Sequence, residues 1–231
     1  MPADNANFSA ERPCSDNTAQ SAKDKTQFNR ARLLLTIIFL ALLCWQWGQA
    51  FAITLKAELA QVLIERAWQQ TLATPHMPAA PWPWADTRPV ARLQWQDQTG
   101  KTRRDLYVLS GAHGSALAFG PGLMDGLGQA KLVSGHRDTH FAFMQHLQIG
   151  DQLRWQTSDG QWQTYVVNEQ RVADSRSDPL WVNDSADSLW LVTCYPFNTL
   201  EAGGPLRYLV HAEPMLEHRL AHNLKNGQVR L

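Results

Sequence analysis

A single cysteine in the globular part of the chain is the first candidate for chemistry. Of the three cysteines, Cys14 lies in a polar tail and Cys44 within an apolar run, so Cys194 has no partner for an intradomain disulfide. A lone cysteine is most often a small buried apolar side chain. Cys194, however, follows an apolar strand-like run and precedes Tyr195-Pro196. This context predicts a position at a strand end, where a thiolate could attack a carbonyl.

Two residues elsewhere in the chain could complete an acyl-transfer site. His136 follows a glycine at a predicted strand-to-loop turn, and Arg207 opens the predicted strand after Cys194. An imidazole can protonate a leaving amine and later deprotonate an incoming one, because its pKa lies near neutrality. A guanidinium can stabilise the oxyanion of a tetrahedral intermediate and hold the substrate backbone. Cysteine, histidine and arginine are together sufficient for acyl transfer.

The neighbours of these groups have roles that the sequence leaves open. Thr193 could hold substrate beside the thiol or only fill a strand position. Asp138 could orient His136 or position a loop, or it could cap a turn, which is the common role of an aspartate after a strand. We assign Thr193 and Asp138 to substrate binding. Arg137 is interpreted as a solvated charge.

Other readings of the same residues lead to different functions. His136, Asp138 and His140 alternate, so on a strand they would share one face and could bind a metal. That arrangement would suit a metal-dependent hydrolase. A membrane-tethered domain that only binds a partner is a further alternative. An L,D-transpeptidase is disfavoured, because its cysteine follows a Ser-His-Gly run and Cys194 follows Leu-Val-Thr.

Composition limits the class of protein. The 231 residues are enough for one compact domain with a tail. Lys plus Arg equals Asp plus Glu, 21 each, so no basic surplus indicates nucleic-acid binding. No acidic cluster demands calcium, and acyl transfer by these residues needs no cofactor.

The elements that must position these residues are short strands. Glycine and polar turns separate the apolar segments after Val90, and Ser158-Asp159-Gly160 is typical of a hairpin. Seven or eight strands with few helices indicate a closed β-barrel or a sandwich. The predicted strands are Ala91–Gln96, Asp105–Leu109, Ala130–Ser134, Gln152–Gln156, Gln161–Glu169, Ser188–Thr193 and Leu206–His211.

The N-terminal part is predicted to anchor the chain in a membrane. Residues 1–32 are polar and expected to be a disordered cytoplasmic tail. Residues 33–55 carry no charge and are long enough to cross a hydrocarbon core of about 30 Å. Lysines and arginines precede this run, so the positive-inside rule places everything after it outside the cytoplasm. A signal peptide cleaved near Ala50-Phe51-Ala52 is the alternative.

Two connecting segments separate the anchor from the strands. Residues 56–74 are predicted to form a helical stalk, with Leu59, Val62, Leu63 and Ala67 at helical spacing. Residues 75–89 are rich in Pro and Trp and are expected to form a linker or a strap over the barrel. The catalytic barrel is then assigned to 90–213, and 214–231 to a C-terminal tail.

The order of these motifs resembles that of sortases. In that family a His is followed by a Cys at a strand end, within a TLxTC-like motif, and then by an Arg on the next strand. Leu191-Val192-Thr193-Cys194 matches LxTC, while Trp190 replaces the leading Thr. His136, Cys194 and Arg207 match the three catalytic positions. The resemblance implies a sortase-like, mostly β fold, namely a closed eight-stranded barrel with few short helices.

A closer resemblance is to the sortases of Gram-negative, largely marine bacteria. It rests on segments beginning at Pro81, Leu117, Gly135 and Thr193, which read PWPWADT, LAFGPG, GHRDTHF and TCYPF. The resemblance implies a cysteine transpeptidase acting on a protein with an LPxTG-like C-terminal sorting signal, with an amine as acceptor. It also implies a single-pass protein of the inner membrane, with its catalytic domain in the periplasm.

Overall fold

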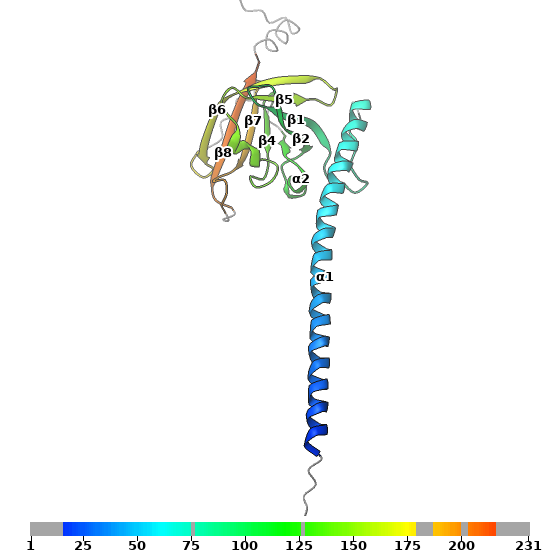
Figure 1. Cartoon of the computed structure of the whole chain (residues 1–231). Coiled ribbons are helices and arrows are strands. Elements are labelled where there is room, and N and C mark those ends of the chain that lie inside the picture. Colours follow the sequence, from blue (N-terminus) through cyan, green and yellow to red (C-terminus); the bar gives the residue numbers. More distant parts are fainter. Residues whose placement is uncertain (1–15, 75–76, 126–127, 179–186, 200–202, 216–231) are drawn as a thin grey trace, which may run out of the picture. The chain divides into compact units, whose positions relative to one another are not determined.

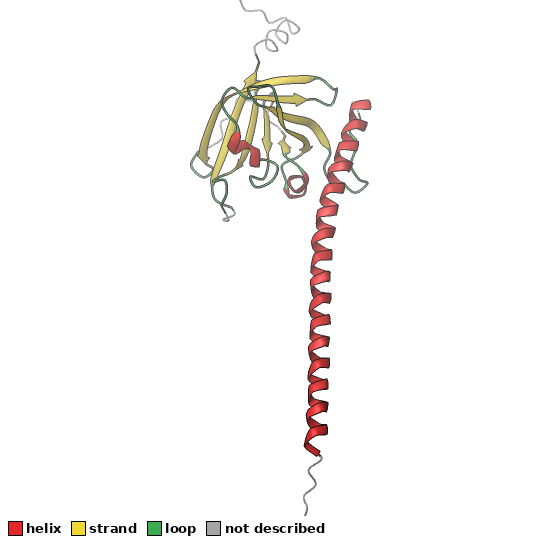
Figure 2. Cartoon of the chain, in the orientation of Figure 1, coloured by secondary structure: helices red, strands yellow, loops and turns green. Residues whose placement is uncertain are grey.

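The structure is a computed structural model that describes residues 16–74, 77–125, 128–178, 187–199 and 203–215. It divides into two compact units, Met1–Lys56 and Ala57–Leu231, which are described separately. Figure 1 labels the elements, and Figure 2 shows that strands dominate the second unit. Most of the predicted C-terminal tail and residues 1–15 lie outside the described residues.

One long helix, α1 (Asp16–Ala73), contains the predicted anchor. Every side chain from 32 to 49 is exposed, including Leu33, Phe39 and Trp45. The Arg32–Ala73 stretch is the one span among the described residues that is long and apolar enough to cross a membrane. The helix begins at Asp16, inside the segment whose composition predicts disorder.

Eight strands form a closed barrel in the order β1-β2-β3-β4-β7-β8-β6-β5. Strands β2 and β3 pair in parallel, as do β4 and β7, and the other pairs are antiparallel. The predicted closed eight-stranded barrel is confirmed. The strands are β1 (Pro89–Gln96), β2 (Thr102–Ser110), β3 (Gly122–Met124), β4 (Lys131–Ser134), β5 (Gln152–Gln156), β6 (Trp162–Asp174), β7 (Leu189–Cys194) and β8 (Leu206–Pro214).

All seven predicted strands are present; the bounds of β5 are as predicted, and those of the others are shifted at one or both ends. The predicted hairpin joins β5 to β6, and Gly160 takes the positive φ of 85° that its turn needs. Strand β6 continues to Asp174, five residues beyond the predicted Glu169. Strand β3 was not predicted, because three residues are too few to show an alternating pattern.

The core lies inside the barrel and is closed by a short helical segment. Inward-facing residues of β1 alternate with half-buried ones, as a strand with one buried face requires. The 3₁₀ helix η1 (Ala142–His146) buries Phe143 and Met144, and Phe141 just before it is fully buried. Phe141 and Phe143 meet edge to face with ring centroids 5.8 Å apart. The loop after β4 therefore supplies part of the core.

The C-terminal part of α1 belongs to the domain. Within residues 57–73 the buried side chains follow helical spacing: Ala60, Ile64, Ala67, Trp68 and Thr71. The Nε1 of Trp68 donates to Gln156 Oε1 at 3.4 Å, which joins the helix to β5. The residues whose spacing predicted the helix do not all face the domain, since Leu59 and Val62 are exposed. Their neighbours one or two positions further along the chain make the contacts instead.

The predicted strap is only partly packed. Trp82 contacts Phe119, at the end of α2 (Gly114–Phe119), edge to face at 5.1 Å between ring centroids. Gln61 of α1 donates to the carbonyl of that same Phe119 at 2.8 Å. Trp84, in contrast, is 82% exposed. The segment is thus fixed to the domain through one of its two tryptophans.

Trp68→Ala should lower the free energy of unfolding of the full chain in detergent by about 3–5 kcal/mol, because a fully buried indole leaves a large cavity. Leu59→Ala, on the exposed face of the same helix, should change it by less than about 0.5 kcal/mol. Chemical denaturation followed by tryptophan-independent circular dichroism measures both. Equal losses in the two variants would contradict the packing described here.

Candidate active site

Cys194 and Arg207 face each other across two neighbouring strands. Cys194 is the last residue of β7, and its antiparallel partner in β8 is Arg207. Both side chains are half-buried. The pairing follows from the ladder of β7 and β8, which begins at Leu189 and Ala212 and ends at this pair. Two residues thirteen positions apart in the sequence are thereby brought into direct register.

His136 approaches the same point from the other side of β7. Strand β4 pairs in parallel with β7 up to Ser134 and Val192. Beyond this pair the Gly135 amide donates to the Val192 carbonyl at 3.2 Å, and the Thr193 hydroxyl donates to the Gly135 carbonyl at 2.7 Å. The next residue on that side is His136, which is exposed. Strands β4, β7 and β8 thus present histidine, cysteine and arginine at one end of the barrel.

The turn that carries His136 is held close to the core. A Cβ added to Gly135 would lie 2.8 Å from the Phe141 ring. The Phe141 amide donates to the His136 carbonyl at 3.0 Å, which closes the turn. Glycine at 135 therefore permits the close approach of the turn to a buried aromatic ring.

Arg137 is buried, although its sequence context predicts a solvated charge. Only 7% of the surface of this residue is exposed. Its Nη1 donates to the Pro196 carbonyl at 2.9 Å and its Nη2 to the Thr199 carbonyl at 3.2 Å. These bonds connect the histidine turn to the segment that follows Cys194. The sequence gave no spacing signal for this contact, because it joins two loops 59 or more residues apart.

Asp138 lies on the outside of the same turn. Its side chain is 64% exposed, and its carboxylate accepts a hydrogen bond from Arg137 Nε at 3.2 Å. Residues 137–140 form a turn rather than a strand. The alternative in which His136, Asp138 and His140 share the face of a strand therefore does not apply to this turn. Among the residues that the structure describes, no three His, Cys, Asp or Glu side chains are placed to hold a metal ion.

His140 sits closer to the interior than His136. Burial lowers its pKa, a hydrogen bond with the backbone of Ala118 opposes this shift, and the charge of His136 lowers the pKa further. The folded state thus favours the neutral form of His140, and protonating it at low pH would cost stability. The two imidazoles lie close enough to influence each other, but they occupy different environments.

The Arg207 guanidinium is anchored through one nitrogen. Its Nη1 donates to the carbonyls of Gly204 and Leu206 at 2.6 and 2.9 Å. Its Nε and Nη2 make no hydrogen bond with any residue in the described part of the chain. The nearby Asp174 is engaged elsewhere: Arg176 donates to its carboxylate and lowers its pKa to about 2. Arg207 therefore retains donors for an external acceptor.

Arg137→Lys should lower the free energy of unfolding by about 1.5–3 kcal/mol, because an ammonium cannot replace the buried fork of hydrogen bonds to Pro196 and Thr199. The matched control is Arg171→Lys, which alters a surface pair with Glu169 and should cost no more than about 1 kcal/mol. Denaturant titration of both variants provides the comparison. A loss no larger than that of the control would mean that the Arg137 contacts do not stabilise the fold.

Comparison of the sequence with protein-family models and with curated proteins finds sortases in both cases. A sortase-domain family model matches residues 99–215. Sortase D of Bacillus subtilis (strain 168) is 33% identical over 82 residues, a match that covers 36% of this chain and 41% of that protein. The matched region therefore spans less than half of that relative.

Solved structures with a similar fold are sortases as well. Sortase A from Corynebacterium diphtheriae is 19% identical, with a TM-score of 0.48 over 68% of this chain and 84% of that one. Sortase C-1 from Actinomyces oris is 23% identical, with a TM-score of 0.43 over 55% of this chain and 72% of that one. Because the sortase-domain model matches just over half of its residues, this chain belongs to the sortase family.

Proposed function

We propose that this sortase is a membrane-anchored cysteine transpeptidase. It cleaves an LPxTG-like C-terminal sorting motif of a partner protein through a thioester on Cys194 and transfers the acyl group to an amine. The observation that supports this proposal most directly is the register that pairs Cys194 with Arg207 and leads His136 to the other side of β7.

Each residue of the set has one task in the proposed reaction. The Cys194 sulfur attacks the peptide carbonyl, and the unengaged Nε and Nη2 of Arg207 donate to the oxyanion that forms. His136 gives a proton to the departing amine as the C–N bond breaks, which leaves the thioester. It then accepts a proton from the incoming amine, whose nitrogen displaces the sulfur. No cofactor takes part in these steps.

Two neighbours are proposed to bind or position substrate. The Thr193 hydroxyl already donates to the Gly135 carbonyl, so its contribution is to hold the turn before His136 against β7. Asp138 is exposed beside that turn and can accept a hydrogen bond from a substrate amide. Its partner Arg137 fixes the carboxylate relative to the segment after Cys194.

We further propose that the chain is a single-pass protein of the inner membrane in a Gram-negative bacterium. The exposed apolar face of α1 up to Leu55 supports membrane insertion. The basic residues ahead of it favour a cytoplasmic N-terminus and a periplasmic catalytic domain. Assignment to the Gram-negative group rests on the sequence segments that begin at Pro81, Leu117, Gly135 and Thr193.

Incubation of the full chain in detergent with LPxTG-like tail peptides should give an acyl adduct on Cys194, detected by mass spectrometry. Cys194→Ala should give no adduct and only background cleavage, whereas a domain that merely binds the peptide would retain its function. Arg207→Ala should reduce the rate roughly 100- to 1000-fold, since one oxyanion donor is lost. Arg207→Lys should restore little of it. Cleavage that persists in Cys194→Ala would overturn the thioester mechanism.

The two histidines of the turn should behave differently. His136→Ala should abolish acyl transfer while Cys194 still reacts with a thiol alkylator, because the leaving amine can no longer be protonated. His140→Ala should retain most activity, since its partly buried ring is not assigned to the reaction. Turnover of both variants is measured side by side, with and without a chelator. Equal loss in both, combined with chelator sensitivity, would favour a metal-dependent hydrolase instead.

A further inference from the structure

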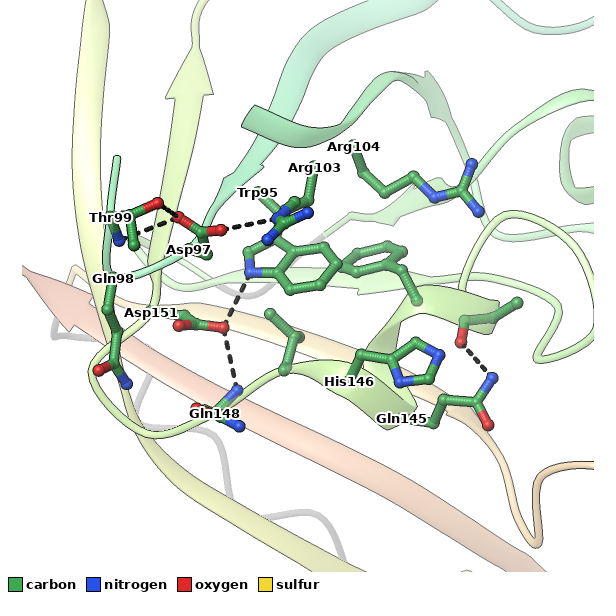
Figure 3. Close-up of a pocket in the computed structure, with 13 residues that line it drawn as sticks. Trp95, Asp97, Gln98, Thr99, Arg103, Arg104, Gln145, His146, Gln148 and Asp151 are labelled. Atoms are coloured by element: carbon green, nitrogen blue, oxygen red, sulfur yellow. Dashed lines mark hydrogen bonds and ion pairs between the residues drawn. The ribbon is translucent and has the colours of Figure 1, made fainter. Parts of the chain in front are cut away.

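A cavity lies where the loop between β1 and β2 approaches η1 (Figure 3). Its volume is about 940 Å³, large enough for several amino-acid residues or a small molecule. The cavity is lined by residues of β1, β2, η1 and the loop before β5. None of the residues of the proposed acyl-transfer set lines it.

The floor of this cavity is aromatic and held in place. The Trp95 and Phe143 rings stack with centroids 5.5 Å apart at an interplanar angle of 23°. Asp151 is 3% exposed, and one of its oxygens accepts hydrogen bonds from Trp95 Nε1 at 2.9 Å and from the Gln148 amide at 3.0 Å. This carboxylate is therefore engaged with the protein rather than with the cavity. A ligand would meet a rigid apolar surface here.

The charged groups at the rim are unevenly engaged. Asp97 accepts hydrogen bonds from Thr99 and, at 2.6 Å, from Arg103, and these bonds lower its pKa. Arg104 is exposed, and its guanidinium makes no hydrogen bond or ion pair with the residues that the structure describes. The His146 side chain is exposed as well. Arg104 and His146 are thus two side chains at the rim that keep donors for a ligand.

In Figure 3 Arg104 and His146 lie apart from each other, but both are on the side of the cavity away from Asp97 and Asp151. The Phe143 ring, stacked on Trp95, also lines the cavity. A guanidinium beside an aromatic surface suits a ligand that carries a carboxylate next to an apolar group. The engaged aspartates on the opposite side would repel a second anion, which favours a single carboxylate.

A hydrogen bond links a residue that lines the cavity to the segment that follows Cys194. Gln145 lines the cavity, and its Oε1 accepts a hydrogen bond from Asn198 at 3.1 Å. Asn198 follows Cys194 by four residues, a distance of at most about 14 Å along an extended backbone. The turn that carries His136 also leads directly into η1. One lining residue of the cavity is therefore in hydrogen-bond contact with the segment that follows Cys194.

We propose that this cavity binds the acceptor substrate, a peptide amine that carries a carboxylate. The proposal rests on the proposed function. In the proposed reaction His136 serves first the leaving amine and then the incoming one, so both nitrogens lie on the histidine side of the thioester. The 3₁₀ helix η1, which follows the turn that carries His136, supplies part of the lining of the cavity. The acceptor amine forms a C–N bond with the acyl carbon as the C–S bond breaks, one amine proton passes to His136, and Cys194 leaves as the thiolate.

Transfer kinetics with the full chain and a sorting peptide test this assignment. The acceptors are Gly-Gly-Gly-Gly-Phe with a free carboxylate and the same peptide as its C-terminal amide. Arg104→Glu should raise the KM for the acid acceptor about tenfold or more, because it replaces a charge-assisted donor with a like charge. The amide acceptor should be nearly unaffected. Cleavage of the sorting peptide by water, without acceptor, should also stay within twofold of the wild type.

The matched control is Arg88→Glu, the same charge reversal at an exposed arginine just before β1, at the opposite end of that strand. It should change neither KM. An Arg104 variant with an unchanged KM for the acid acceptor would overturn the inference while leaving the proposed function intact. A raised KM for the sorting peptide in place of the acceptor would assign the cavity to the leaving segment and also overturn it. If the wild type forms no thioester, the proposed function fails first.

Discussion

The hydrogen-bond register of β7 against its two neighbours determines the arrangement around Cys194. On one side β8 pairs Cys194 with Arg207, and on the other β4 runs parallel until Gly135 bonds to Val192. If β7 slipped by one residue relative to its two neighbours, the Cys194 side chain would turn to the opposite face of the sheet. The closed barrel resists such a slip, because the buried residues of β7 are packed inside it. The position of the thiol is thus a property of the whole barrel.

The loops beyond the strand ends are tied together by a buried charge. The Arg137 guanidinium donates to the carbonyls of Pro196 and Thr199, which links the turn after β4 to the segment after β7. A cation that is 7% exposed is tolerated because several acceptors replace its hydration. Thr193 adds a second link between the same two segments through Gly135.

Features with a local signal could be predicted from the sequence, and features that join distant segments could not. Alternating apolar residues and turn glycines predicted most strands, and the strand-end position of Cys194 followed from the same pattern. Strand β3 was too short to be recognised. The burial of Arg137 was missed, because its acceptors are backbone carbonyls of another loop, which no side-chain pattern reveals. Which face of α1 is buried could not be predicted either: Leu59 and Leu63 satisfy helical spacing as well as Ile64 and Trp68 do, and only packing against the barrel decides which of them are buried.

The closure of the barrel also limits how any peptide can be recognised. Strands β4, β7 and β8 are paired with one another, so a bound peptide cannot be inserted between them as another strand. The stretches paired on one side only lie elsewhere: β2 bonds to β3 only at Leu109 and Ser110, and β5 pairs with β6 only up to Val166. Beside the thiol, selectivity must therefore come from side chains and from the backbone of loops. Exchanging loops between members of such a fold would then alter which peptides are chosen without disturbing the ladder that holds the thiol, an arrangement well suited to diversification.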